Sequence, residues 1–228
     1  MSLGIPKRLA HIWVGHKEPP IEWMNTWRHH HPDWEYVLYD NNYLTGRQWR
    51  NQSLINTYFK QGRYEGVSDL IRYEILLHEG GFVPEADAEC LMPCDALFEK
   101  ATAYTVYENE FRKPGLVSPF IAASPGHPFL ETIVTDLGQR WTPDTLKVPW
   151  RSTGNKYLKH RISEHSPDIV IFPSHFFIPE HKSGVCYDGD GPIYARQHWG
   201  TTGRKYSEPD EQVTIRRREA VLQRLLER

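Results

Sequence analysis

Apolar side chains along this chain follow helical repeats in some segments and short unbroken runs in others. The clearest helical repeat covers residues 67–79, where the apolar positions form one broad surface. Gly80 and Gly81 end this predicted helix, because glycine readily adopts the backbone conformation of a helix C-cap. Phe82 and Val83 follow as a short buried strand. This segment therefore predicts a helix, a sharp turn and a strand in immediate succession.

The same reasoning divides the rest of the chain into strands and helices. Strands are predicted at residues 9–14, 35–39, 103–107, 117–123 and 169–172, and helices at residues 21–31, 49–61, 128–141, 155–164 and 215–226. The two kinds of element alternate regularly in the first half and less regularly in the second. This order favours an α/β fold with an open, mainly parallel or mixed sheet flanked by helices. Such sheets bind ligands at the carboxyl ends of their strands.

The sequence shows no repeat, low-complexity tract or long linker that would divide it. A hydrophobic content of 39% in 228 residues is enough for a sizeable core. We therefore predict a single domain for residues 1–228, with its core in residues 5–200 and an amphipathic C-terminal helix at about residues 211–228.

The composition excludes some partners. A net charge of −2 gives no electrostatic reason to expect binding to nucleic acid. No apolar stretch approaches the roughly 20 residues that span a bilayer, and no signal-peptide core follows Met1. We expect a cytoplasmic protein without a transmembrane segment, for which peripheral contact with the inner face of a membrane stays open. The oligomeric state is not indicated.

Several acidic side chains follow predicted strands. The acidic triplet Glu85-Ala86-Asp87 places two carboxylates one residue apart, where they can hold a hard cation such as Mg²⁺ or Mn²⁺ against a diphosphate. Glu108 ends the strand predicted at residues 103–107 and could orient the hydroxyl groups of a substrate. A solvated acidic loop and an ordinary surface glutamate are the alternative interpretations.

Two side chains on the helix at residues 67–79, Asp69 and Arg72, are three positions apart and project to the same side. A carboxylate there can bind ribose hydroxyls, and a guanidinium can bind phosphate or sugar oxygens. The alternative is an ion pair of little energetic value. Trp13 ends the first predicted strand, where its indole could stack on a nucleotide base or fill the core.

The segment SDLIRYEILLHEGG, from Ser68 to Gly81, followed by the acidic triplet, resembles the core of the glycosyltransferases with a DXD sugar-binding region. This is the Och1-like group, glycosyltransferase family 32, whose distant relatives include the clostridial glucosylating toxins. Glu85 stands here where the family has its first aspartate, and Pro84 precedes it.

Two further blocks carry the resemblance. The run HIWVG around Trp13 looks like the opening block of the family. The run YARQHW at residues 194–199 looks like its C-terminal block, commonly Tyr-Ala-x-His-x-Trp. Gln197 takes the histidine position if the Tyr-Ala pair is aligned, and His198 takes it if the His-Trp pair is aligned.

The resemblance implies a GT-A nucleotide-diphospho-sugar transferase fold and a set of roles for the chain's own residues. It implies that Trp13 stacks on the base, Asp69 and Arg72 bind ribose and sugar or phosphate, Glu85 faces ribose and sugar, Asp87 binds Mn²⁺ or Mg²⁺, and His198 contacts the metal or the diphosphate. We expect Asp87, Glu85 and Glu108 to be catalytic. Glu108 is included because of its position at the end of a predicted strand, and not because of the resemblance.

The implied activity is metal-dependent, retaining transfer of a sugar from a nucleotide-diphosphate donor to a glycan, glycolipid or similar hydroxyl acceptor, as in polysaccharide biosynthesis. One alternative is a non-catalytic nucleotide-sugar or carbohydrate-binding module, because the DXD motif is altered. Another is a glycoside hydrolase, which needs two carboxylates about 5–10 Å apart on separate elements. Glu85 and Asp87 share one short segment, which disfavours the hydrolase. The sequence does not identify the base, the sugar or the acceptor.

Overall fold

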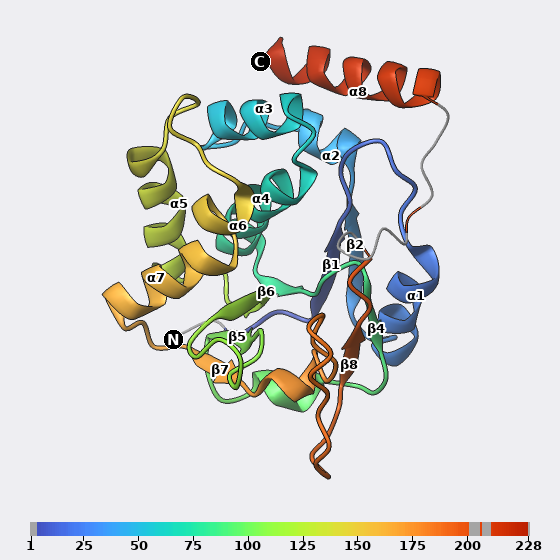
Figure 1. Cartoon of the computed structure of the whole chain (residues 1–228), viewed down its shortest axis with the longest axis vertical. Coiled ribbons are helices and arrows are strands. Elements are labelled where there is room, and N and C mark those ends of the chain that lie inside the picture. Colours follow the sequence, from blue (N-terminus) through green and yellow to red (C-terminus); the bar gives the residue numbers. More distant parts are fainter. Residues whose placement is uncertain (1–3, 201–205, 207–210, 228) are drawn as a thin grey trace.

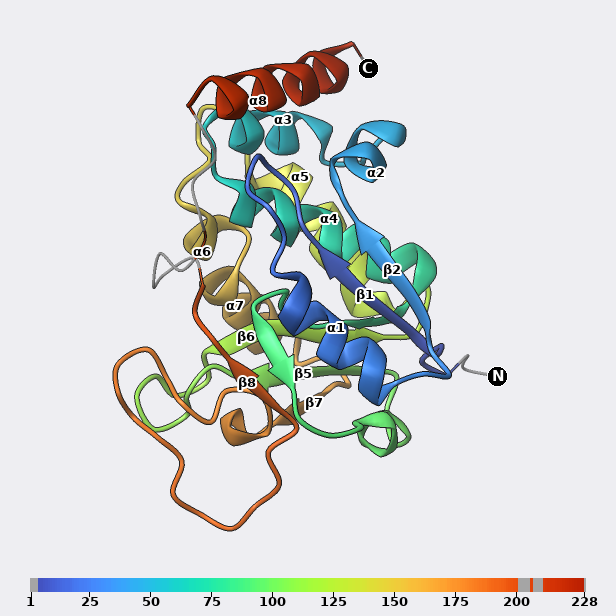
Figure 2. The same cartoon turned by 90° about the vertical axis from the view of Figure 1, so that its right-hand side faces the viewer.

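A computed structural model describes residues 4–200, 206 and 211–227, which form an α/β fold around a six-stranded mixed sheet (Figures 1 and 2). In sheet order the strands are β2 (Glu35–Tyr39), β1 (Arg8–Ile12), β3 (Gly81–Val83), β6 (Val117–Ala123), β5 (Ala103–Tyr107) and β7 (Val170–Phe172). β1 is parallel to β2 and β3, and β7 is parallel to β5. Only β6 runs antiparallel to its neighbours within this sheet. The expected open, mostly parallel sheet is confirmed.

Helices and a second small sheet surround this layer. The α-helices are α1 (Ile21–His30), α2 (Asn41–Gly46), α3 (Gln52–Lys60), α4 (Tyr64–Glu79), α5 (Pro128–Arg140), α6 (Pro149–Ser152), α7 (Asn155–His165) and α8 (Glu211–Leu226). The small sheet pairs β4 (Ala88–Cys90) with β8 (Ala195–Gln197) in antiparallel register. Short 3₁₀ turns lie at Asp95–Phe98 and Ser174–Phe176. No helix in the described part of the chain is both long and apolar enough to span a bilayer.

The sequence predicted all six strands of the main sheet and the longer helices, but it missed β4, β8, α2 and α6. Each missed element is six residues or shorter, too short to show a hydrophobic period. Helix α2 begins at Asp40, whose carboxylate accepts the backbone N–H groups of Asn42 and Tyr43. The carboxylate therefore acts as an N-cap rather than as a simple strand end.

Two hydrophobic clusters pack against opposite faces of the sheet. The larger cluster joins α3, α4, α5 and α7 to side chains such as Ala10 and Val83, and the smaller joins α1 and β4 to Leu9 and Phe82. Successive strand residues face opposite clusters, as the pleat requires. Helix α4 is buried around most of its circumference, so its polar side chains need partners inside the protein.

The turn between α4 and β3 depends on glycine. Gly80 and Gly81 both have positive φ, of 65° and 103°. A Cβ atom on Gly81 would lie 2.5 Å from the carbonyl oxygen of Arg8 on β1, which is closer than any real contact. The two glycines therefore allow the chain to leave the helix and enter the sheet beside β1 without a loop.

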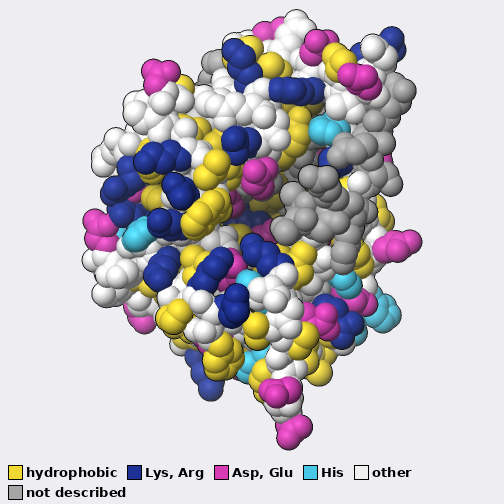
Figure 3. Space-filling view, in the orientation of Figure 1, with side chains coloured by type: hydrophobic (Ala, Val, Ile, Leu, Met, Phe, Trp, Pro, Cys, Tyr) yellow, Lys and Arg dark blue, Asp and Glu magenta, His cyan; other side chains and the backbone are white. Residues whose placement is uncertain are grey.

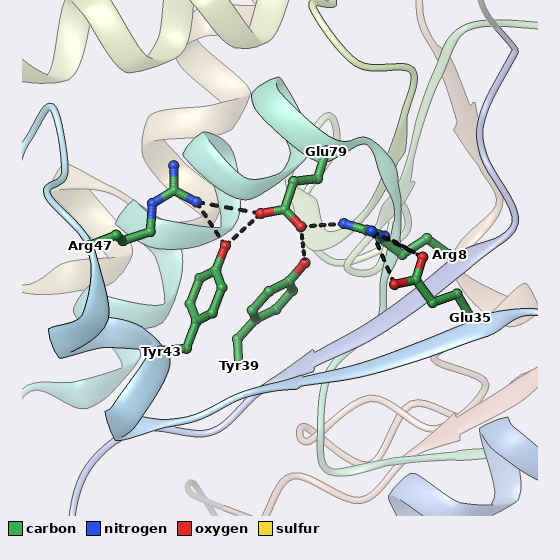
Figure 4. Close-up of polar contacts among 6 residues, drawn as sticks. All are labelled: Arg8, Glu35, Tyr39, Tyr43, Arg47 and Glu79. Carbon is green, nitrogen blue, oxygen red and sulfur yellow. Dashed lines mark hydrogen bonds and ion pairs between the residues drawn. The ribbon is translucent and has the colours of Figure 1, made fainter.

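Glu79, the last residue of α4, gathers side chains from three elements (Figure 4). Its Oε2 accepts a hydrogen bond from the Tyr39 hydroxyl at 2.6 Å and pairs with Arg8. Its Oε1 accepts from Tyr43 at 2.5 Å and lies 3.4 Å from Nη1 of Arg47. Burial alone would raise the pKa of Glu79, but these hydroxyls and guanidinium groups lower it. The carboxylate thus joins α4, β1, β2 and α2 at the sheet edge away from the acidic triplet.

We predict that Glu79→Ala lowers the free energy of unfolding by about 2 kcal/mol at neutral pH, because four donors lose their acceptor. The lowered pKa means that the contribution of Glu79 is present above the unfolded carboxyl's pKa and is lost as the pH falls below about 4.5. Urea unfolding of both proteins over a pH series measures this. The exposed Arg50–Glu131 pair is the control, and Glu131→Ala should cost less than about 0.5 kcal/mol. Equal costs for the two variants would contradict the prediction.

Candidate functional site

A cavity of about 800 Å³ opens at the carboxyl ends of β1, β3 and β5. It appears as a hollow in the molecular surface in Figure 3. Six of the residues singled out from the sequence line it, namely Trp13, Asp69, Arg72, Glu85, Asp87 and Glu108. They come from the ends of three strands and from α4, so the sheet topology brings together residues that lie far apart in the sequence.

Trp13 lies directly after β1 and is half-buried at the cavity wall. Its indole N–H donates to the carbonyl of Lys17 at 2.8 Å, which fixes the orientation of the ring. Tyr206 packs edge-on against it, with ring centroids 5.0 Å apart. Trp13 is therefore an ordered aromatic surface at the cavity rather than a core residue.

Asp69 on α4 lies in the cavity floor and is 8% exposed. Thr153, directly after α6, donates from Oγ1 to Oδ2 of Asp69 at 2.9 Å. Burial raises the pKa of Asp69 to about 8, although Arg72 and the Thr153 hydroxyl act in the opposite direction. The raised pKa favours the neutral carboxylic acid, which can both donate and accept a hydrogen bond.

Arg72 is 3% exposed and its donors are largely engaged. Nη1 donates to the carbonyl oxygens of Val83 at 2.7 Å and Pro119 at 2.5 Å, and Nη2 donates to Glu85 Oε1 at 2.8 Å. The guanidinium therefore holds the facing ends of β3 and β6 and orients Glu85. Its side chain shapes the floor of the cavity in addition to lining it.

The acidic triplet continues from β3 into the cavity. Burial raises the pKa of Glu85, the Arg72 guanidinium opposes this shift, and the neighbouring Asp87 charge adds to it. Asp87 is held by the C-terminal part of the chain, because Gln197 Nε2 donates to Oδ1 and the Gly200 N–H donates to Oδ2, both at 2.7 Å. The carboxylate of Asp87 is thus fixed in orientation while it still lines the cavity.

His198 lies elsewhere. Its imidazole stacks on Trp23, with ring centroids 4.3 Å apart, and its Nε2 is 3.1 Å from Glu89. Only its backbone contacts the site, where the His198 N–H donates a hydrogen bond to the carbonyl oxygen of Asp87 at 2.9 Å. The side chain does not line the cavity. Of the two alignments of the C-terminal block, the structure places Gln197, not His198, against the Asp87 carboxylate.

The donor set bears on the kind of metal that the site can take. Across the described ranges, no three side chains of His, Cys, Asp or Glu converge as a metal site. The oxygen atoms of Asp87 and Glu85 suit Mg²⁺ or Mn²⁺, and such ions are often held by one or two carboxylates with substrate phosphates and water completing the shell. The residues present therefore fit a cation shared with a bound diphosphate.

Glu108, at the end of β5, is 4% exposed and surrounded by cations. Its Oε1 lies 3.1 Å from His181 Nε2, 3.6 Å from Lys113 Nζ and 3.9 Å from Lys182 Nζ, while Oε2 accepts from Asn155. Burial would raise the pKa of Glu108, but these partners lower it. Glu108 is an internal counter-ion at the cavity wall.

No sequence pattern pointed to Lys113 and Lys182 as residues of the site. Both sit in connecting segments without a motif, and both line the cavity only because the loops bring them to Glu108. Gln197 lies in the YARQHW block, where one of the two alignments gives it the histidine position. Thr153 is identified only by its hydrogen bond to Asp69.

Comparisons with known proteins agree with this geometry. Residues 20–104 match the family described as a glycosyltransferase sugar-binding region containing the DXD motif. Inositol phosphoceramide mannosyltransferase 1 of Schizosaccharomyces pombe is 30% identical over 206 residues, covering 81% of this chain and 63% of that protein. Inositol phosphoceramide mannosyltransferase 3 of the same yeast is 23% identical, covering 87% of this chain and 61% of the relative. The chain thus spans about three fifths of the length of both relatives.

Among solved structures, the PaToxG glycosyltransferase superposes with a TM-score of 0.61 at 13% identity, covering 72% of this chain and 71% of that one. A match at this identity establishes similarity of fold. It confirms the GT-A architecture that the sequence resemblance implied.

The protonation of Asp69 leads to a testable prediction. Asp69→Asn should raise the free energy of unfolding by about 1 kcal/mol or more at pH 8, because the amide carries no charge that burial disfavours and its oxygen can still accept from Thr153. Because the pKa of Asp69 is raised in the folded protein, the free energy of unfolding of the parent falls as the pH rises from 3.8 to about 8. The difference in stability between Asp69→Asn and the parent should therefore vanish near pH 3.8. Denaturant unfolding over that pH range measures it.

Asp136 provides a control of opposite sign. Burial would raise its pKa, but Arg140, Tyr157 and Arg161 lower it. Asp136→Asn should therefore destabilise the protein at neutral pH. If Asp69→Asn also destabilised it, by an amount independent of pH, the protonated state of Asp69 would be refuted.

Proposed function

We propose that this chain, whose residues 20–104 match the glycosyltransferases with a DXD sugar-binding region, transfers a sugar from a nucleotide-diphosphate donor to a hydroxyl group of a glycan or glycolipid. The observation that carries the proposal is the convergence of Trp13, Asp69 and Asp87 in one cavity at the carboxyl ends of the strands. This is the edge at which open α/β sheets bind nucleotides.

We assign each of these residues to a different part of the nucleotide-sugar donor. The indole of Trp13 offers a flat surface on which a base can stack, because its ring is already oriented by the bond to Lys17. The protonated carboxyl of Asp69 can donate to one hydroxyl oxygen of ribose or sugar and accept from another. Glu85, held by Arg72, lies between Asp69 and the metal-binding position.

Asp87 is the residue that we assign to the Mn²⁺ or Mg²⁺ ion. A bound cation of this type neutralises the charge that develops on the leaving diphosphate. The chain's contribution is to hold the Asp87 oxygens in place through Gln197 and Gly200, so that little reorganisation is needed when the donor binds. Lys113 and Lys182 add positive charge at the same cavity.

The finer points of the proposal rest on the relatives. Two proteins similar to this chain are named inositol phosphoceramide mannosyltransferases, so we propose mannose as the sugar and a glycolipid as the acceptor. Retention of the anomeric configuration follows from the family resemblance. The competing function is binding of a nucleotide sugar or carbohydrate without catalysis. The ion pair between Arg72 and Glu85 favours it, because this pair occupies the carboxylate of Glu85, the altered first position of the DXD motif.

A ligand screen separates these functions. Melting temperatures are measured with GDP, UDP and their sugars, with and without Mn²⁺, since a ligand bound by the folded state raises the apparent stability. Donor hydrolysis is then followed with the nucleotide sugar that binds. Binding together with Mn²⁺-dependent turnover supports the transferase, whereas tight binding without turnover on any acceptor supports the binding module.

We predict that Asp87→Asn lowers Mn²⁺-dependent donor hydrolysis at least about a hundredfold, because the metal loses its charged ligand. The fold should persist, with the melting temperature within about 3 °C of the parent, since Gln197 can present its unpaired Oε1 to the new amide. The matched control is Glu89→Gln, which removes a neighbouring carboxylate outside the cavity and should change the rate less than threefold, or roughly within the scatter of surface substitutions. Equal losses in both variants would refute the role of Asp87.

A further inference from the structure

The loop between β5 and β6 presents an aromatic ring to solvent. Phe111 is 79% exposed, more than any other large hydrophobic side chain in the described ranges. The loop is nevertheless ordered, because Asn109 Oδ1 accepts the Arg112 N–H at 2.9 Å and Lys159 on α7 donates to the Pro114 carbonyl at 2.7 Å. An ordered loop that holds a phenyl ring in water favours contact with an apolar partner.

A second exposed aromatic side chain lies at the cavity itself. Trp150 on α6 is 49% exposed and lines the cavity. Two cations flank its ring: Arg151 Cζ lies 5.4 Å from the ring centroid and Lys156 Nζ lies 5.7 Å from it. Tryptophan beside lysine and arginine is the combination found where proteins meet the headgroup region of a bilayer.

Basic side chains lie beside both rings. Arg112 and Lys113 follow Phe111 in the loop, Arg151 and Lys156 lie at the Trp150 ring, and Figure 3 shows Lys and Arg side chains gathered with hydrophobic ones beside the hollow. The acidic residue of the same loop, Glu110, is engaged internally, where its carboxylate accepts the backbone N–H of Ser174 at 3.2 Å. Within the described ranges Arg112, Arg151 and Lys156 form no ion pair with a carboxylate, whereas Lys113 is paired with Glu108 at 3.6 Å.

We propose that this surface docks on a membrane that contains anionic phospholipid. We name it the aromatic–basic rim, and it consists of Phe111, Arg112, Lys113, Trp150, Arg151 and Lys156. The two rings enter the headgroup layer, and Arg112, Arg151 and Lys156 pair with lipid phosphates, while Lys113 adds positive charge beside Glu108. The cavity then opens toward the lipid surface. The proposal goes beyond the sugar transfer reaction, because binding to vesicles requires neither donor nor acceptor.

A lipid surface fits the rim better than nucleic acid does. The phenyl ring of Phe111 stands at a loop tip, where a bilayer can accept it as apolar surface. A chain with a net charge of −2 is not attracted to nucleic acid over long distances. At a membrane the local cations of the rim act within a Debye length of the lipid, and their attraction adds to the apolar contribution of Phe111.

The test is co-sedimentation of the full chain with vesicles of phosphatidylcholine alone or of an equimolar mixture with phosphatidylglycerol. We expect binding to the mixed vesicles that weakens as salt is added. Phe111→Ser and the double variant Arg112→Glu with Lys156→Glu should each weaken it at least about tenfold, the amount expected from losing a buried ring or reversing two charges. Unchanged melting temperatures show that these exposed substitutions leave the fold intact.

Helix α8 supplies matched controls at the far end of the molecule (Figures 1 and 2). Leu226→Ser removes an apolar side chain that is 63% exposed, and Arg216→Glu reverses an exposed charge. Both should bind vesicles like the parent. The proposal would be overturned if the chain bound neutral and mixed vesicles equally, or bound neither. It would also be overturned if only the α8 variants lost binding, or if the chain preferred duplex DNA to the mixed vesicles. Donor hydrolysis in vesicle-free buffer is measured in parallel, and its absence would count against the transferase rather than against docking.

Discussion

The geometry of the cavity depends on one buried cation, the guanidinium of Arg72. Its bonds to the carbonyls of Val83 and Pro119 hold the ends of two antiparallel strands at a fixed separation. Its bond to Glu85 then orients the first carboxylate beyond β3. A buried charge requires such partners, so the helix, the strand ends and the acidic triplet are stable only together. Trp13 and Glu108 take their positions from the same sheet edge.

Charge is layered around this cation. Acidic groups occupy the floor, where burial raises the pKa of both Asp69 and Glu85. Lysines stand at the wall, where Glu108 is their counter-ion. An anionic ligand therefore meets positive charge at the entrance and needs a cation of its own at the floor. This arrangement suits a diphosphate that arrives together with a metal ion.

The sequence predicted the main sheet and α4 because their apolar periods are long and unambiguous. It also predicted the cavity residues Trp13, Asp69 and Asp87, since each follows or faces a strand end in a block that resembles a known family. It did not reveal β4 and β8, whose three-residue pairing arises from contacts between distant segments. For the same reason, sequence spacing alone could not decide between Gln197 and His198. Lys113 and Lys182 were not predicted, because only the path of the loops brings them to Glu108 at the cavity wall.

The bonds from Gln197 and Gly200 to Asp87 connect positions more than a hundred residues apart in the chain. Ribosomal synthesis delivers the sheet strands and the acidic triplet well before it delivers these two partners. A nascent chain can thus complete much of its core while the Asp87 carboxylate still lacks its restraints. The restraints on the Asp87 carboxylate are consequently completed late in synthesis, only after residues 197–200 have left the exit tunnel.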